Sequence, residues 1–314
     1  MIPGIYRDMD SATYFGDPCP EPSLSQSIAK VLIERSPLHA KMEHPRLCPP
    51  SAADDDQERY DKAKAIGNAA HKLMLGRGKD LAIICSNDFR NKAAKEERDA
   101  AYSAGLEPVL EKHLETATEM TAAALSQISQ IPGCVHAFDK AAGDSEVVAV
   151  ACEEGLWLRT MIDWITPDLR EVWDFKTSGM SASPYATGRL MASAGWHVQA
   201  AMHERILDAI DPDSAGRRRF FYVCQENETP YALTVNEIGE SALTIGRKQI
   251  QYAVDAWRRC LQCNSWPAYP QRIIIPELPA WSESGWMDRE TSEYDARQVE
   301  PNRRAPMLKS LMGG

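Results

Sequence analysis

The sequence contains no run of about 18 apolar residues, which is the length that a transmembrane helix needs. Its first seven residues lack the basic-then-apolar layout of a secretory signal peptide. No internal repeat is visible, and 44% hydrophobic with 25% charged residues is ordinary for a soluble globular protein. These absences predict a cytoplasmic protein without a membrane partner. A chain of 314 residues can bury its core without disulfides or a structural metal.

Cysteine is sparse and scattered, with eight residues spread over the chain. Most lie alone in apolar surroundings, so buried thiols are expected rather than a disulfide framework. Cys260 and Cys263 alone have metal-like spacing, and a tetrahedral site would need two more ligands. No second pair of cysteines or histidines stands nearby in sequence, which favours two helix-end cysteines that bind nothing.

The chain also lacks an excess of positive charge. Its 35 Lys and Arg against 45 Asp and Glu give a net charge of −10, which argues against a protein that coats nucleic acid non-specifically. A nuclease is not excluded, because carboxylates that hold a metal add negative charge and DNA contact can be local. Candidate basic patches are residues 217–219, residues 258–259 and the group Lys72, Arg77 and Lys79, although each can equally be a solvated surface.

Periodicity predicts a helical first half and a mixed second half. Helices are expected near residues 23–33 and 57–76, and two more within 88–130, separated near Gly105 and Pro108. Residues 146–152, 156–165 and 171–177 predict a three-stranded antiparallel meander, followed by a helix at 188–210, strands at 218–225 and 230–235, and a helix at 239–262. Residues 276–314 are expected to form a weakly ordered tail.

Two acids and a lysine near the ends of successive strands form the strongest chemical signal. Side chains alternate faces along a strand, so Asp174 and Lys176 project together while Trp173 and Phe175 can fill a core. A hairpin with the preceding strand can place Asp163 beside Asp174. Two close carboxylates repel each other unless a cation lies between them, and their hard oxygens suit Mg²⁺ or Mn²⁺.

A lysine beside such a metal supplies the remaining part needed for phosphodiester hydrolysis. The metal lowers the pKa of a bound water, and Lys176 can orient or deprotonate that water or stabilise the developing negative charge. An Asp-x-Lys motif alone is weak, and the simpler alternative is a surface Asp–Lys pair at a strand end.

Motifs around this pair resemble the PD-(D/E)XK nuclease superfamily. The resemblance rests on Asp163-Trp164, on Asp174-Phe175-Lys176-Thr177 and on Gln199 in the following helix. Upstream, Gly67-Asn68-Ala69-Ala70-His71 resembles the G-x-x-x-H helix motif of the RecE-type (exonuclease VIII) and RecB-type branches. Ser25-Gln26-Ser27 and Ser36-Pro37-Leu38-His39 are similar to the N-terminal segment of RecE-like phage and prophage exonucleases.

The resemblance implies a fold that spans residues 1–275. This would be a restriction-endonuclease-like α/β core, with a central mixed β-sheet flanked by helices. Its parts would be a helical N-terminal part over residues 1–135 and a catalytic core over residues 140–275. The tail at 276–314 lies beyond it.

The resemblance also implies roles for individual residues. Asp163, Asp174 and the backbone carbonyl of Phe175 would bind Mg²⁺ or Mn²⁺, and Lys176 would be the catalytic lysine. His71 would reach the metal from its helix, and Gly67, one turn earlier, permits close approach to the sheet. Glu146 resembles an additional acidic ligand, with a solvated strand-end glutamate as the alternative.

A glutamine motif on the next helix completes the implied site. Gln199 matches the first position of a Q-x-x-x-Y motif, whose tyrosine position here holds His203. The pair would contact a phosphate or the DNA end, since histidine can still donate a hydrogen bond. The neighbouring His197 faces elsewhere and is interpreted as structural.

The expected activity is metal-dependent hydrolysis at the ends of linear double-stranded DNA, 5′ to 3′, in recombination by single-strand annealing. The implied partners are a RecT-like annealing protein and further copies of the chain in a ring, in a bacterial host cell. Two alternatives stay open. One is a RecB-like or CRISPR-associated nuclease with an iron–sulfur cluster, which needs four clustered cysteines. The other is a catalytically silent DNA-end-binding adaptor, motivated by His203 and the acidic charge balance.

Overall fold

The protein is described here by a computed structural model that covers residues 1–48 and 61–310, with side chains described up to residue 295. The chain divides into two compact units, Met1–Tyr269 and Pro270–Gly314. No helix in the described ranges is both long enough and apolar enough to cross a membrane. The start of the helix expected at 57–76 lies outside the described residues.

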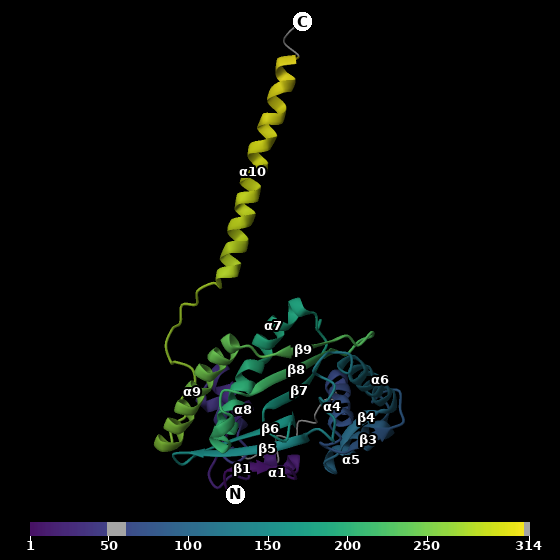
Figure 1. Cartoon of the computed structure of the whole chain (residues 1–314). Helices are drawn as coiled ribbons and strands as arrows, with labels where there is room; N and C mark the ends of the chain where they lie inside the picture. The colour runs from purple at the N-terminus through teal and green to yellow at the C-terminus, as the bar shows by residue number, and fades with distance from the viewer. Residues whose placement is uncertain (49–60, 311–314) are drawn as a thin grey trace. The chain divides into compact units, whose positions relative to one another are not determined.

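A seven-stranded mixed sheet forms the centre of the first unit (Figure 1). Its strand order is β1-β5-β6-β7-β8-β9, with β2 pairing with β6. The bounds are β1 (Gly4–Tyr6), β2 (Leu24–Ser25), β5 (Asp144–Glu153), β6 (Leu156–Ile165), β7 (Glu171–Ser178), β8 (Arg219–Glu226) and β9 (Leu233–Glu237). The predicted meander is confirmed, because β5, β6 and β7 pair antiparallel, whereas β7 and β8 pair parallel.

Helices cover both faces of this sheet and bury the apolar side chains that alternate along its strands. One core cluster joins Val147, Leu158 and Tyr222 to helices on one face, and the other joins Trp173 and Phe175 to helices on the opposite face. The first set is α2 (Gln26–Glu34), α8 (Trp196–Ile210) and α9 (Glu240–Cys263), and the second is α4 (Lys62–Leu75) and α6 (Glu111–Ile128). The expected mixed sheet flanked by helices is therefore confirmed.

The N-terminal part is less purely helical than predicted. Besides β1 and β2, it contains a two-stranded parallel sheet of β3 (Leu81–Ile84) and β4 (Glu107–Leu110). Pro108 does separate the helices α5 (Lys92–Ser103) and α6, as predicted, but it lies within β4. The strands were missed because four-residue apolar segments have too little length to show a period. The remaining helices of this part are α1 (Ser11–Phe15) and α3 (Pro37–Glu43).

The long helix predicted at residues 188–210 is two helices, α7 (Pro184–Ala194) and α8. Gly195 separates them with φ +73°, a left-handed conformation that glycine adopts without a steric penalty. The break fixes the start of α8 and therefore the position of the side chains that α8 directs at the sheet. A short 3₁₀ helix, η1 (Pro212–Ser214), leads from α8 into β8.

A buried ion-pair cluster ties the N-terminal segment to strand β6. Asp17 has a fully buried side chain and lies 3.1 Å from Arg159 Nη1 and 3.2 Å from His44 Nε2. The hydroxyl of Ser23 donates to Asp17 at 2.6 Å. Burial raises the pKa of Asp17, but these partners outweigh burial and lower it to about 2. The cluster therefore depends on Asp17 being ionised.

The second unit contains helix α10 (Ala280–Ser310). This helix occupies most of the segment 276–314, for which the sequence predicted a weakly ordered tail, and in it strong helix formers outnumber the breakers that suggested the tail. Trp281 and Trp286 are 78% and 59% exposed. Their side chains make no part of the buried core.

Candidate nuclease active site

The candidate site lies where the central sheet opens between neighbouring strands. Strands β6 and β7 pair at Trp164 with Trp173 and at Ile165 with Val172. Extending this register by one residue puts Asp163 opposite Asp174, and at that step the backbone pairing ends. The structure therefore confirms the predicted hairpin, which brings the two acids together.

The same interruption occurs between β5 and β6. Their pairing includes Ser145 with Trp164 and Val147 with Ile162, but it omits Glu146 and Asp163 between them. Glu146 has φ +50°, which is uncommon for a residue with a side chain. The three acids Glu146, Asp163 and Asp174 thus occupy one row across three adjacent strands. Backbone conformation of this kind clusters at functional sites.

Asp163 is held by one backbone and one side-chain partner. Its Oδ2 accepts a hydrogen bond from the backbone N–H of Phe175 at 3.0 Å and lies 3.1 Å from His71 Nε2. Burial raises the pKa of Asp163, but the adjacent His71 charge and hydrogen bond outweigh it and lower the pKa. Burial lowers the pKa of His71, but the charge and hydrogen bond of Asp163 together with the charge of Asp174 outweigh burial and raise the pKa. His71 and Asp163 therefore form an ion pair.

Asp174 lies deeper, with only 2% of its side chain exposed. Its Oδ1 is 2.6 Å from Lys176 Nζ, and its Oδ2 accepts a 2.6 Å hydrogen bond from Gln199 Nε2. Burial first, and the charge of Asp163 second, raise the pKa of Asp174 to about 6. Lys176 has a raised pKa because the two acids outweigh its burial, so it stays protonated. A cation bound between the two carboxylates would relieve their mutual repulsion.

Glu146 is close to the site but makes weaker contacts. It is 8% exposed, and its Oε1 lies 4.0 Å from His71 Nδ1. Burial raises its pKa. A Cβ on Gly78, which has φ +97°, would approach Glu146 Oε1 to 3.1 Å. The solvated strand-end glutamate that we kept as an alternative is wrong, because the side chain is buried and faces His71.

His203 lies on α8 one turn after Gln199 and is buried against strand β6. Its side chain is 1% exposed, and Nδ1 lies 2.9 Å from Thr160 Oγ1 on β6. Burial lowers its pKa to about 3, so it is neutral. The contact of His203 with DNA stays a prediction, and the buried position of its ring gives that prediction no support. Gln199, one turn earlier on α8, does reach Asp174.

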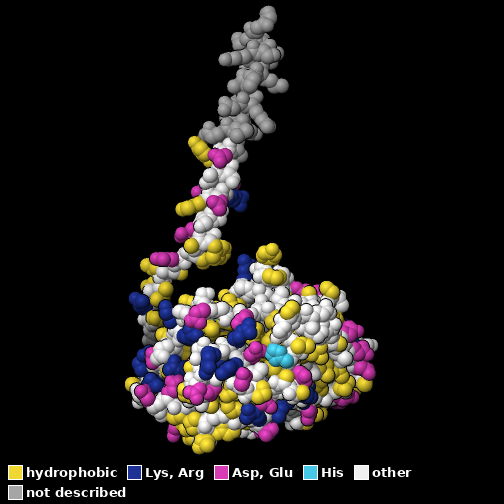
Figure 2. All heavy atoms as spheres, viewed as in Figure 1, with side chains coloured by type: hydrophobic (Ala, Val, Ile, Leu, Met, Phe, Trp, Pro, Cys, Tyr) yellow, Lys and Arg dark blue, Asp and Glu magenta, His cyan; other side chains and the backbone are white. Residues whose placement is uncertain are grey.

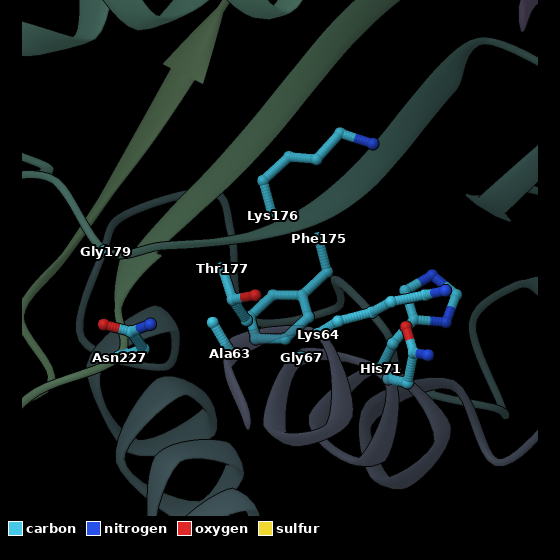
Figure 3. A pocket seen from close by; sticks show the side chains of 10 residues that line it. Ala63, Lys64, Gly67, His71, Phe175, Lys176, Thr177, Gly179 and Asn227 are labelled. Atoms are coloured by element: carbon cyan, nitrogen blue, oxygen red, sulfur yellow. The ribbon is translucent and has the colours of Figure 1, made fainter. Parts of the chain in front are cut away.

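Helix α4 approaches the sheet closely at Gly67. A Cβ on this residue would lie 2.8 Å from Thr177 Oγ1 on β7, so the close approach predicted for Gly67 is confirmed. Figure 3 shows Phe175 and Thr177 pointing toward α4, whereas Lys176 points away from it. Gly67 therefore sets how near His71, one turn later, comes to Asp163.

The carboxylate oxygens of the site are suitable ligands for a hard divalent cation, although the described side chains do not surround a metal position. No group of three His, Cys, Asp or Glu side chains within the described ranges is arranged to hold a metal ion. Mg²⁺ does not require such a group, because it is commonly bound through one or two carboxylates and keeps several waters. Asp163 and Asp174 supply those carboxylates, and a cation would offset the burial and the charge of Asp163 that together raise the pKa of Asp174.

The cysteines give no support to an iron–sulfur cluster. All eight are free thiols, and Cys260 is buried whereas Cys263 is exposed. Such a cluster needs four thiolates together, which no described group supplies. The two cysteines do lie at the end of α9, as predicted.

Several of the arginines and lysines considered as basic patches have structural partners instead. Arg218 is buried against Asp208 and Asp211, and Arg219 pairs with Glu237 at 2.8 Å. Lys72 lies 3.0 Å from Asp80. On the face in view in Figure 2, Lys and Arg side chains are interspersed with Asp and Glu. Charge alone therefore does not locate a nucleic-acid surface.

Residues 46–274 match the model of a protein family described as PDDEXK-like domain of unknown function (DUF3799). The chain belongs to this PDDEXK-like family. The match includes His71, Asp163, Asp174 and Lys176. No curated protein matches the sequence.

The fold of this PDDEXK-like chain is also found among solved structures. A crystal structure from Eubacterium rectale, named "Putative exonuclease", superposes with a TM-score of 0.52 at 11% sequence identity. The alignment covers 87% of this chain and 96% of that one. At this identity the similarity concerns the fold.

Some residues near the site of the PDDEXK-like chain carried no signal in the sequence. Thr160, whose Oγ1 lies 2.9 Å from His203 Nδ1, and Asn227, directly after β8, belong to no spacing that indicates chemistry. Lys64 lies on α4 one turn before Asn68, and only the position of Gly67 against the sheet brings it to the site. Helical spacing from His71 could have indicated Lys64, since residues seven apart share a face.

Proposed function

We propose that this chain is a metal-dependent nuclease that hydrolyses phosphodiester bonds of DNA. The observation that carries the proposal is the row of buried acids at the opening of the sheet, with Lys176 2.6 Å from Asp174. A surface Asp–Lys pair would not keep an acid that is 2% exposed beside a second acid. Membership of a PDDEXK-like family supports the same chemistry.

Asp163, Asp174 and the backbone carbonyl of Phe175 would hold the ion, which we propose to be Mg²⁺ or Mn²⁺. When bound, the ion lowers the pKa of water and neutralises charge on phosphate. Lys176, whose Nζ lies 2.6 Å from Asp174, would orient the attacking water or stabilise the developing negative charge. Gln199 fixes the carboxylate of Asp174 by its hydrogen bond, and His71 fixes that of Asp163.

We further propose that the substrate is the end of linear double-stranded DNA, degraded 5′ to 3′. The N-terminal resemblance to RecE-like exonucleases supports this, as does the name "Putative exonuclease" of the structural neighbour. A single-strand annealing protein and a ring of identical chains are the corresponding proposed partners. A silent DNA-end-binding adaptor is less well supported, because a site without chemistry has no need of two opposed buried acids.

Digestion of end-labelled linear duplex with and without Mg²⁺ tests the proposal. Asp174→Ala and Lys176→Ala are each expected to lower the cleavage rate at least about 100-fold while folding is preserved. Asp213→Ala and Lys248→Ala, at exposed positions, are the matched controls. Degradation that is equal in all five proteins and insensitive to EDTA would show that the nuclease proposal is wrong. Equal cleavage of closed circular DNA would overturn the preference for ends.

A further inference from the structure

Two exposed helix faces take no part in the candidate nuclease site. One belongs to α9 in the first unit and the other to α10 in the second. Each carries large apolar side chains that are at least half exposed: Ile245 and Tyr252 on α9, and Trp286, Met287 and Tyr294 on α10. Apolar side chains that gather on an exposed face among polar residues mark interaction surfaces. A partner is therefore expected to cover both faces.

The outer face of α9 combines its apolar side chains with positive charge. Ile245, Lys248, Tyr252 and Arg259 recur at helical spacing and therefore share this face. Lys248 and Arg259 are exposed and form no ion pair within the described residues. Asp255 lies at the margin of the face and already pairs with an arginine of the same helix. The face is therefore basic and apolar.

The described part of α10 combines its apolar side chains with negative charge. Residues 280–295 contain five Asp and Glu against one Arg. Glu283, Met287, Glu290 and Tyr294 follow one another at helical spacing, so acids and apolar side chains share a face. Figure 2 shows this mixture of apolar and acidic side chains along the helix. The face is therefore acidic and apolar.

These two faces are complementary in charge, in polarity and in length. Cations of the α9 face can meet carboxylates of the α10 face while the aromatic and aliphatic side chains pack between them. The α9 face extends from Ile245 to Arg259, about 21 Å, and the α10 face from Glu283 to Tyr294, about 17 Å, at 1.5 Å per helical residue. Helices pack side by side through such rows of side chains.

We propose that α10 of one copy of the chain packs on the outer face of α9 of a second copy. The inference specifies the surfaces of the association of identical chains proposed above, and it does not depend on the chemistry of the nuclease site. Because the contact joins two different faces, it closes either by reciprocal exchange between two copies or from copy to copy in a ring.

The segment before α10 favours a second copy over a return to the same chain. Residues 270–279 include Pro270, Pro276 and Pro279. Proline-rich segments are extended and act as semi-rigid spacers. Such a spacer opposes the reversal that would bring α10 back onto α9 of its own chain, whereas it can present α10 to another molecule.

Reversing the charge of each face in turn tests the contact. Light scattering coupled to size-exclusion chromatography, over a dilution series of the full chain, gives the mass and the Kd of self-association. We expect the wild type to be larger than one chain. The double variants Lys248→Glu/Arg259→Glu and Glu283→Lys/Glu290→Lys should each raise this Kd at least about tenfold, because like charges then face each other.

Mixing the two double variants separates a contact between copies from a contact within one chain. In an equimolar mixture, the reversed α9 face of one variant meets the reversed α10 face of the other, and the two unreversed faces also meet. Opposite charges are then restored at both kinds of contact, so the mixture should regain the mass of the wild type. This recovery would also show that both variants are folded.

Matched charge reversals elsewhere on the surface provide the controls. Lys79→Glu/Lys95→Glu and Glu97→Lys/Glu228→Lys change the net charge equally at exposed positions outside both faces. They should leave the mass and the Kd of the wild type unchanged. The proposal is wrong if the wild type has the mass of one chain at every concentration, if the controls dissociate as readily as the test variants, or if mixing does not restore association.

The mass measurement and the cleavage assay test separate properties. The described contacts of Asp163, Asp174 and Lys176 lie within one chain. Recovery of association on mixing, combined with no metal-dependent cleavage by the wild type, would keep the contact and reject the nuclease. Metal-dependent cleavage by a wild type that has the mass of one chain would keep the nuclease and reject the contact.

Discussion

Replacing Gly67 by alanine tests whether the approach of α4 to the sheet controls the site. A Cβ at this position would lie 2.8 Å from Thr177 Oγ1, and ordinary contact begins at 3.4 Å, so a movement of about 0.6 Å is required. Thr177 is β-branched and its side chain is restricted in rotation. We therefore expect α4 to take up part of the shift and carry His71 with it.

Two effects on stability compete in this variant. Alanine is favoured over glycine in a helix by about 1 kcal/mol. Overpacking costs about 1–3 kcal/mol. The free energy of unfolding of Gly67→Ala should therefore be unchanged or fall by about 2 kcal/mol. The cleavage rate should fall about tenfold, because displaced catalytic groups lose rate steeply with distance.

Chemical denaturation and the cleavage assay measure the two quantities. Gly188→Ala on α7 is the control, since a Cβ there meets nothing within 4 Å, and it should gain about 1 kcal/mol. Adding Thr177→Ala to Gly67→Ala removes the colliding oxygen and should recover at least about 1 kcal/mol in a double-mutant cycle. Should Gly67→Ala gain stability like Gly188→Ala and keep full activity, the close approach would have no functional role.

Three further predictions concern stability and metal binding. The pKa of Asp17 is lowered to about 2 in the fold, so its ionised form stabilises the protein above about pH 4, and the contribution is lost as the pH falls toward 2. Asp17→Asn should remove about 2 kcal/mol of this pH dependence in acid denaturation, and an unchanged profile would contradict the role of the cluster. Gly246→Ala would place a Cβ against the backbone carbonyl of His197 on α8, so the free energy of unfolding should fall by about 2 kcal/mol, and an unaltered urea midpoint would refute this. Mg²⁺ at about 100 times its Kd should stabilise the wild type by about 2.7 kcal/mol in thermal unfolding, and an equal effect on Asp174→Ala would exclude binding at this acid.

The sequence was informative about the sheet because its signals are local. The alternation of Trp173 and Phe175 with Asp174 and Lys176 follows from strand geometry alone, and the structure places the two pairs on opposite faces. Helix boundaries were less predictable. Gly195 divides α7 from α8 through a left-handed conformation that the flanking sequence does not require.

The residues of the site that belong to a motif could be predicted from the sequence. The residues whose position depends on tertiary packing could not. Asp163, Asp174, Lys176, Gln199 and His71 do come together in space. The buried ring of His203 contacts Thr160, 43 positions earlier, and no spacing rule connects the two residues. The approach of Gly246 to His197 is likewise a matter of how α8 and α9 cross.

The interrupted strand pairing gives the two acids different tolerances to substitution. Asp163 accepts a hydrogen bond from the backbone N–H of Phe175, a donor that a neighbouring strand would otherwise satisfy. The carboxylate of Asp163 therefore also links β7 to β6. The contacts described for the carboxylate of Asp174 are with two side chains, those of Lys176 and Gln199. An alanine at position 163 would therefore release the backbone of β7, whereas an alanine at position 174 would leave both strands in place. For trapping a bound but uncleaved DNA strand, position 174 is accordingly the one to replace.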